Sequence, residues 1–169
     1  MAMVGVLFVC SGNICRSPLA EALFRRRLEE VGLDGKVVVD SAGTGAWHVG
    51  EPPCPGTLAT LRRLGLSADG LMARQVTDDD FHTFDYILAM DRENLAILER
   101  RRKRLFGDDP QTGPVIELFL RYAPELGVLD VNDPYYNGRH DLTYRQVAAG
   151  VEGFLKHLSG EMGRLAHEA

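Results

Sequence analysis

Short runs of apolar residues alternate along the chain with longer segments whose apolar residues recur every three or four positions. Four of the short runs are rich in β-branched residues and predict strands at Val4–Cys10, Lys36–Ser41, Asp85–Met90 and Val115–Leu120. Helical patterns separate these strands. An α/β fold therefore follows, in which a parallel sheet is covered by helices on both faces as a three-layer domain.

Amphipathic periodicity places the helices at about Pro18 to Val31, from Pro55 to near Gly65, after Asp91, and from near Thr143 onward. Ser17 is the expected N-cap of the first helix, with Pro18 at its first helical position. Thr143 and Gln146 have the spacing of a capping box, which predicts the start of the last helix.

Composition narrows the class of protein. A chain of 169 residues with 45% hydrophobic content can bury one good core, so residues 1–169 are expected to form a single domain. A net charge of −5 argues against a nucleic-acid partner. No apolar run approaches the roughly 20 residues of a membrane span. Three cysteines, with one closely spaced pair and no second, suggest neither a disulfide framework nor a zinc site, which favours a cytoplasmic protein.

The segment that joins the first strand to the first helix carries the chemistry: Cys10-Ser11-Gly12-Asn13-Ile14-Cys15-Arg16-Ser17. Backbone N–H groups in a short loop that opens a helix form an anion site, and the same positive potential favours the thiolate of Cys10. Arg16 adds a planar fork that can hold two phosphate oxygens. Gly12 and Asn13 suit left-handed backbone. A phosphate-handling cysteine enzyme is predicted, against the alternative of a buried structural cysteine.

The segment from Cys10 to Pro18 resembles, almost letter for letter, the hallmark loop of the low-molecular-weight protein tyrosine phosphatases. Further landmarks of that family follow in its order: Ser41-Ala42-Gly43-Thr44, Ala73-Arg74-Gln75, the stretch from Phe84 to Asp91, and Asp133-Pro134-Tyr135-Tyr136. Together with right-handed crossovers, the resemblance implies a four-stranded sheet of order 2-1-3-4. It also implies hydrolysis of phosphotyrosine in proteins and of small aryl phosphates through a cysteinyl-phosphate intermediate, with inorganic phosphate as product and without metal or cofactor.

Asp133 is the candidate general acid and base for the two steps of this reaction. Pro134 favours an extended Asp133, and without Cys10 a solvated turn aspartate would be the better interpretation. Ser17 and Ser41 are expected to support the loop, Ser17 by a hydrogen bond to the Cys10 sulfur and Ser41 by one to the side chain of Asn13. Capping and turn roles are equally open for both serines.

Aromatic residues are expected at the rim of the site. Trp47 lies in a glycine-rich loop and could stack on a substrate ring, while Tyr135 could close the opposite side. Tyr136 is the second of two adjacent tyrosines, and the family resemblance implies that it could itself be phosphorylated. Cys15 could form a reversible disulfide with Cys10 under peroxide, unless geometry forbids it.

Two positions depart from the family's pattern, because Leu71 stands where a histidine is common and Cys54 where an aspartate is common. Three alternatives stay open: a protein arginine phosphatase, an arsenate reductase of the same fold, and a non-catalytic phosphate-binding module. Ile14, Trp47 and Tyr135 favour phosphotyrosine over phosphoarginine. An arsenate reductase needs a further cysteine pair for its relay, and a binding module has no need of both Cys10 and Asp133.

Overall fold

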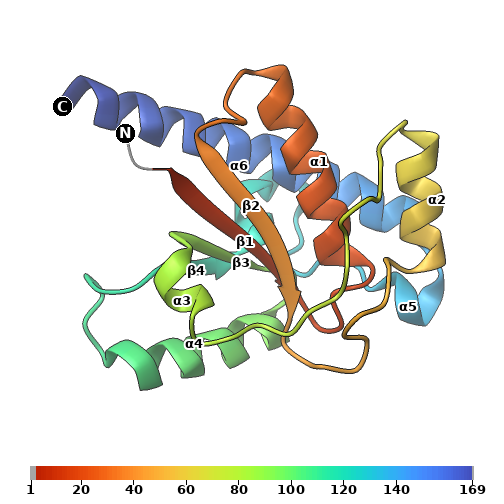
Figure 1. Cartoon of the computed structure of the whole chain (residues 1–169), viewed down its shortest axis with the longest axis horizontal. Helices are drawn as coiled ribbons and strands as arrows, with labels where there is room; N and C mark the ends of the chain where they lie inside the picture. The colour runs from red at the N-terminus through yellow and green to blue at the C-terminus, as the bar shows by residue number, and fades with distance from the viewer. Residues whose placement is uncertain (1–2, 169) are drawn as a thin grey trace.

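A computed structural model describes residues 3–168 of the chain (Figure 1). Its sheet contains β1 (Val4–Cys10), β2 (Val37–Gly43), β3 (Tyr86–Ala89) and β4 (Val115–Leu118). All neighbouring strands are parallel, and the order β2-β1-β3-β4 confirms the predicted topology. The first strand lies between β2 and β3, so its carboxyl end opens at the middle of one sheet edge.

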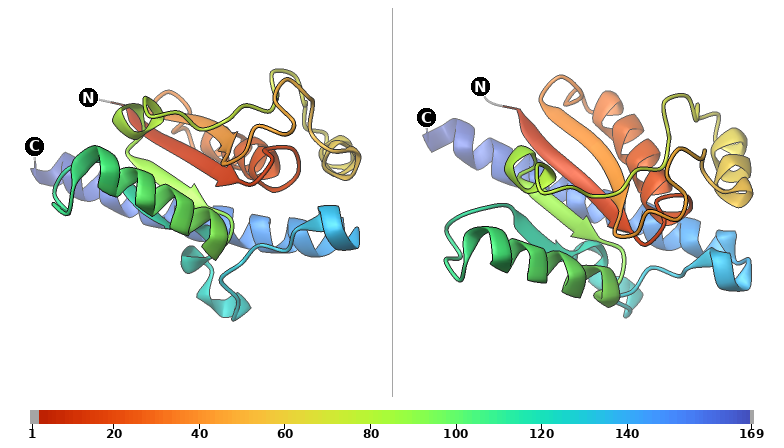
Figure 2. Two further views of the ribbon diagram at one scale, coloured as in Figure 1. Left: turned by 90° about the horizontal axis from the view of Figure 1, so that it is seen from below. Right: turned by 60° about the horizontal axis from the view of Figure 1, so that its bottom comes forward.

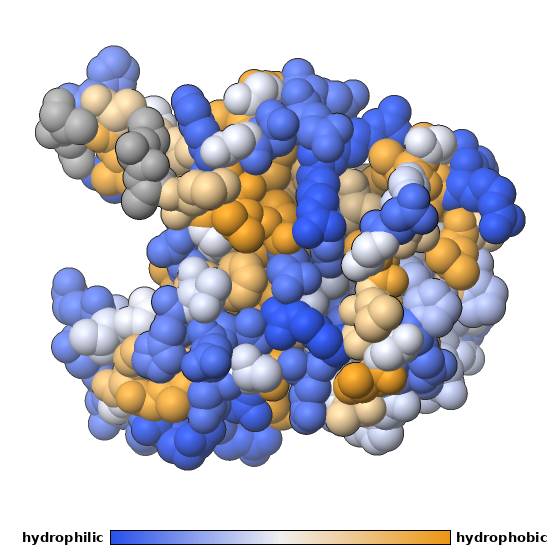
Figure 3. Space-filling model, viewed as in Figure 1, coloured by the Kyte–Doolittle hydropathy of each residue, from blue (hydrophilic) through white to orange (hydrophobic). Residues whose placement is uncertain are grey.

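The helices are α1 (Arg16–Glu30), α2 (Pro55–Arg63), α3 (Asp80–Thr83), α4 (Arg92–Phe106), α5 (Pro134–Asn137) and α6 (His140–Glu168), with 3-10 turns η1 (Phe119–Tyr122) and η2 (Pro124–Leu126). Helices α3 and α4 cover one face of the sheet, and α1 and α6 pack together on the other (Figure 2). The three expected layers are therefore present. Hydrophilic side chains predominate on the outer surface of α4 (Figure 3).

The buried side chains of β1 contribute alternately to two separate cores, because successive side chains of a strand point to opposite faces of the sheet. Phe8 is fully buried with α1 and α6, where its ring meets those of Phe24 and Phe119 at centroid distances of 5.6 and 5.4 Å. Leu7 and Val9 are fully buried on the α3 and α4 side. This central strand is thus rigidly held at the point where it delivers Cys10.

Two predicted helix starts are wrong. Helix α1 begins at Arg16 with Cys15 at its N-cap position, so Ser17 is not a cap and Pro18 is not its first residue. Helix α6 begins at His140, which places Thr143 and Gln146 inside it. Their side chains bind the backbone of Asn132 instead: Gln146 Oε1 accepts from the N–H at 2.7 Å, and Thr143 Oγ1 donates to the carbonyl at 2.9 Å.

Residues 3–168 include no helix with the length and apolar character needed to cross a membrane.

Candidate active site

The loop between β1 and α1 is shaped by two residues. Asn13 has φ of 58°, the left-handed backbone that the sequence predicted. Gly12 does not share that conformation, so the predicted reason for this glycine is wrong. A Cβ atom at Gly12 would lie 2.8 Å from His48 Cδ2, so any larger residue there would displace the His48 ring, which packs directly on the loop.

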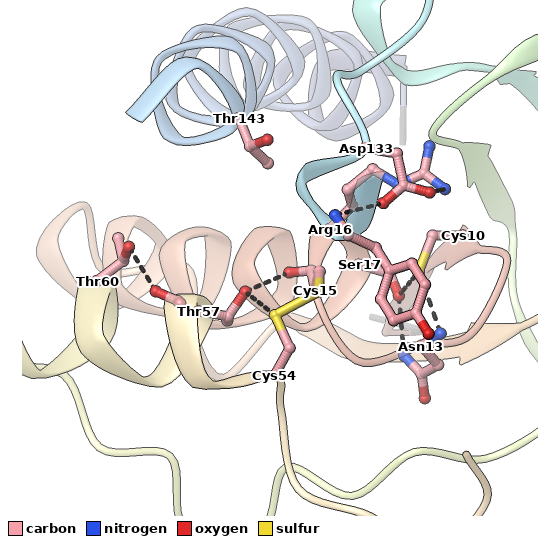
Figure 4. The surroundings of a disulfide bond; sticks show 12 residues. Cys10, Asn13, Cys15, Arg16, Ser17, Cys54, Thr57, Thr60, Asp133 and Thr143 are labelled. Carbon is pink, nitrogen blue, oxygen red and sulfur yellow. Dashed lines mark hydrogen bonds and ion pairs between the residues drawn. A yellow bond between two sulfur atoms is a disulfide. The ribbon is translucent and has the colours of Figure 1, made fainter. Parts of the chain in front are cut away.

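The Cys10 side chain sits at the base of this loop, and the residue is only 3% exposed. Its sulfur accepts a hydrogen bond from the Asn13 N–H at 3.2 Å and lies 2.9 Å from Ser17 Oγ (Figure 4). Asn13 Nδ2 donates to Ser41 Oγ at 3.0 Å. Both predicted serine contacts are therefore present. The loop directs hydrogen-bond donors toward the sulfur, as a site for an anionic nucleophile requires.

Arg16 is also only 3% exposed and is held by two carboxylates. Its Nη1 lies 2.7 Å from Asp91 Oδ2, and its Nη2 lies 3.3 Å from Asp133 Oδ2. Burial by itself lowers the pKa of Arg16. The charge of Cys10, the hydrogen bond to Asp91 and the charges of both aspartates raise that pKa by more, so the net shift is upward. The guanidinium therefore stays charged and is fixed in one orientation beside the sulfur.

Asp91 is a functional residue that sequence reasoning missed. It lies between β3 and α4, caps α4 by accepting the Asn94 N–H at 2.7 Å, and orients Arg16 with its second oxygen. A signal was available, because an acidic residue between a parallel strand and a helix N-terminus stands at the sheet edge where ligands bind.

Asp133 reaches the site from a distant part of the chain. Its backbone is extended (φ −91°, ψ 103°), as Pro134 predicted, and its Oδ1 accepts the Tyr135 N–H at 3.1 Å. The preceding Asn132 is anchored to α6, and the Val131 N–H donates to the Met90 carbonyl at 2.8 Å, just after β3. These anchors hold Asp133 at the cavity that Cys10 also lines.

A cavity of about 640 Å³ lies over the sulfur and brings the predicted site residues together. Its lining includes Cys10, Ser11, Gly12, Ile14, Cys15, Arg16, Asp133 and the predicted rim residues Trp47, Tyr135 and Tyr136. Asn13, Ser17 and Ser41 are buried and do not line the cavity. His48 and Glu93 also line the cavity, and the sequence reasoning overlooked them.

The aromatic rim is open to solvent. The exposed fractions are 72% for Trp47, 65% for Tyr135 and 83% for Tyr136. His48 also faces the cavity, with its Nδ1 2.8 Å from Glu51 Oε2 and its ring centroid 6.3 Å from that of Tyr135. Such exposed rings are free to contact a flat substrate.

The expected pairing of Cys15 with Cys10 is contradicted, because Cys15 forms a disulfide with Cys54 (Figure 4). The start of α2 is drawn against the loop by the Cys54 N–H, which donates to the Ile14 carbonyl at 2.6 Å, and by Thr57 Oγ1, which donates to the Cys15 carbonyl at 2.9 Å. The Cα atoms of Cys15 and Cys54 are 5.3 Å apart, within the usual range of disulfides. Cys10 remains a free thiol.

No group of three or more His, Cys, Asp or Glu side chains within residues 3–168 is arranged to hold a metal ion.

A thiol at the base of an anion-binding loop, with an arginine fixed beside it on a parallel α/β sheet, fits the class of cysteine-dependent phosphatases. The model of the family "Low molecular weight phosphotyrosine protein phosphatase" matches residues 5–168. The chain therefore belongs to this family, whose curated relatives carry the name of a hydrolase.

The relatives match over nearly their full length. The chain is 45% identical over 159 residues to the low molecular weight protein-tyrosine-phosphatase YfkJ of Bacillus subtilis, covering 94% of this chain and 98% of that protein. The crystal structure of YfkJ matches with a TM-score of 0.87 over 95% of this chain and 98% of that one. The structure of DARP, a drosophila arginine phosphatase, matches with a TM-score of 0.83 at 35% identity, covering 90% and 96%.

Proposed function

We propose that this protein hydrolyses phosphotyrosine in proteins, and small aryl phosphates, with Cys10 as nucleophile, Arg16 as phosphate clamp and Asp133 as general acid and base. The observation that supports this most directly is that all three side chains line one cavity. Asp133 Oδ2 lies 3.3 Å from Arg16 Nη2, which supports its role as a proton donor close to the group that would hold the phosphate.

In the first step the Cys10 sulfur attacks phosphorus, and the bond between phosphorus and the ester oxygen breaks. The proton of the Asp133 carboxylic acid goes to the departing oxygen, which leaves as a neutral phenol. Loop N–H groups from Ser11 to Arg16 and the Arg16 guanidinium bind the three non-bridging oxygens. Because these donors are already fixed, they stabilise the charge of the transition state without reorganising.

In the second step the Asp133 carboxylate accepts a proton from water, and the resulting hydroxide oxygen attacks phosphorus. The bond between sulfur and phosphorus breaks, Cys10 returns as a thiolate, and inorganic phosphate leaves. Neither step uses a metal ion or a cofactor.

Specificity for aryl phosphates rests on the rim. Trp47 and Tyr135 offer two aromatic surfaces to a substrate ring above the loop. The likeness to the drosophila arginine phosphatase makes phosphoarginine the second candidate substrate. Arsenate reduction is a weaker candidate, because the disulfide occupies both cysteines other than Cys10.

We further propose that residues 1–169 act as one domain, of which residues 1, 2 and 169 lie outside the described part. A cytoplasmic location is also part of the proposal, because a reducing compartment would keep the Cys10 thiol usable. The net charge of −5 supports the absence of a nucleic-acid partner.

The test compares Cys10→Ser and Asp133→Asn with the wild type on p-nitrophenyl phosphate and on phosphotyrosine. Cys10→Ser should abolish turnover while phosphate still binds. Asp133→Asn should lower kcat on phosphotyrosine by about 10²-fold or more, but much less on p-nitrophenyl phosphate, whose leaving group needs no proton. Asp130→Asn, in the same loop but paired with Arg92 at the surface, is the matched control and should keep the wild-type ratio.

A Cys10→Ser variant that turns over would contradict the covalent route. Equal loss on both substrates in Asp133→Asn would contradict the role of Asp133 as acid. Phosphoarginine, phosphoserine and arsenate with a thiol reductant, assayed in parallel, distinguish the alternative substrates.

A further inference from the structure

A buried carboxylate lies behind the active-site loop without lining the cavity. Glu21 on α1 is only 4% exposed. Its Oε1 accepts a hydrogen bond from Ser41 Oγ at 2.6 Å, and its Oε2 pairs with Arg25. Burial raises the pKa of Glu21, whereas the hydrogen bond from Ser41 and the charge of Arg25 oppose that shift. A charged group so costly to bury calls for a role beyond packing.

The hydrogen bonds that start at Glu21 have a fixed direction. A carboxylate can only accept, so the single proton of Ser41 Oγ is used on Glu21. Ser41 Oγ must then accept from Asn13 Nδ2, which lies 3.0 Å away. The orientation of the Asn13 amide agrees, because its Oδ1 already accepts the Arg74 N–H at 2.9 Å.

The hydrogen bonds keep this donor-to-acceptor order as far as the Cys10 sulfur. Asn13 Nδ2 also donates to Ser17 Oγ at 2.8 Å, which leaves the Ser17 proton free to point at Cys10 Sγ, 2.9 Å away (Figure 4). Ser17 is fully buried, so water cannot supply another acceptor. The sulfur thus receives a hydrogen bond as thiolate, in addition to the one from the Asn13 N–H.

We propose that Glu21 is a positioning residue for Cys10, acting through Ser41, Asn13 and Ser17 to keep a hydroxyl proton directed at the sulfur. This inference rests on the proposed function, in which Cys10 is the nucleophile. It assigns a catalytic consequence to a carboxylate that never touches the substrate.

A simple electrostatic effect predicts the opposite change in the reactivity of Cys10 when Glu21 is replaced. Removing a buried negative charge near a thiolate favours the thiolate, and should make Cys10 more reactive. Removing the acceptor that anchors the hydrogen-bond chain should make Cys10 less reactive. The direction of the change therefore separates the two explanations.

The experiment measures the rate at which iodoacetamide alkylates Cys10 at pH 6, with the adduct located by peptide mass spectrometry. Glu21→Met removes the acceptor at similar volume and should slow alkylation roughly fivefold, the effect of about one net hydrogen bond. Glu21→Gln keeps an amide oxygen that can accept from Ser41, so it should recover part of that loss. Leu28→Ala, a buried position on the same helix, is the control for lost stability and should keep the wild-type rate.

A double-mutant cycle tests the connection to Ser17. In a Ser17→Ala background, where the last donor is missing, Glu21→Met should cause no further slowing. Unchanged or faster alkylation in Glu21→Met, no recovery in Glu21→Gln, or additive losses in the double variant would each overturn the proposal. These outcomes leave the proposed function standing, whereas a wild-type Cys10 no more reactive than free cysteine would remove it.

Discussion

The disulfide between Cys15 and Cys54 should contribute measurably to stability, because it ties the active-site loop to α2 across 39 positions of sequence. A cross-link restricts the unfolded chain, and for a loop of this length the chain-entropy relation gives about 4 kcal/mol at 25 °C. Changing Cys54 to Ser removes the link at a position that is not in the catalytic mechanism. The free energy of unfolding of the air-oxidised protein should fall by up to about this amount.

The assay is urea unfolding followed by tryptophan fluorescence and circular dichroism, with and without dithiothreitol. Reductant should shift the wild-type midpoint downward and leave Cys54→Ser unchanged. Thiol titration under denaturing conditions should find one reactive thiol in the oxidised wild type and three after reduction, since the chain has three cysteines. Three titratable thiols before reduction, or a wild-type urea midpoint that does not change with dithiothreitol, would refute the reasoning.

Three further predictions concern the nucleophile, the rim and the partly buried Tyr122. With the other two cysteines joined, Cys10 has no cysteine partner, so activity lost to excess peroxide should not return with dithiothreitol; full recovery would contradict this. Trp47→Ala should raise KM for phosphotyrosine more than it lowers kcat, and an unchanged KM would show that this 72% exposed ring does not contact substrate. Burial, followed by the hydrogen bond to Glu117, raises the pKa of Tyr122, so the folded protein keeps a proton that the unfolded chain loses. Unfolding free energy should then fall as pH rises above about 10, and less steeply in Tyr122→Phe.

The loop chemistry could be predicted because it is local. Cys10, Arg16 and the backbone between them form one short segment, and a strand before it and a helix after it fix its shape. The parallel sheet followed from the alternation of strands and helices, and its strand order was implied by right-handed crossovers together with the family resemblance. Even the extended backbone of Asp133 could be predicted, because the ring of Pro134 restricts the residue before it.

Side-chain partners that are distant in sequence were decided by the tertiary structure. Three examples are the contacts of Cys15 with Cys54, of Arg16 with Asp91 and of Glu21 with Ser41. Each contact depends on how strands and helices pack, which no local sequence pattern encodes. The spacing of Thr143 and Gln146 was misleading for the same reason. A polar side chain in a capping pattern binds whichever backbone group folding brings near, and at these two positions that group belongs to Asn132.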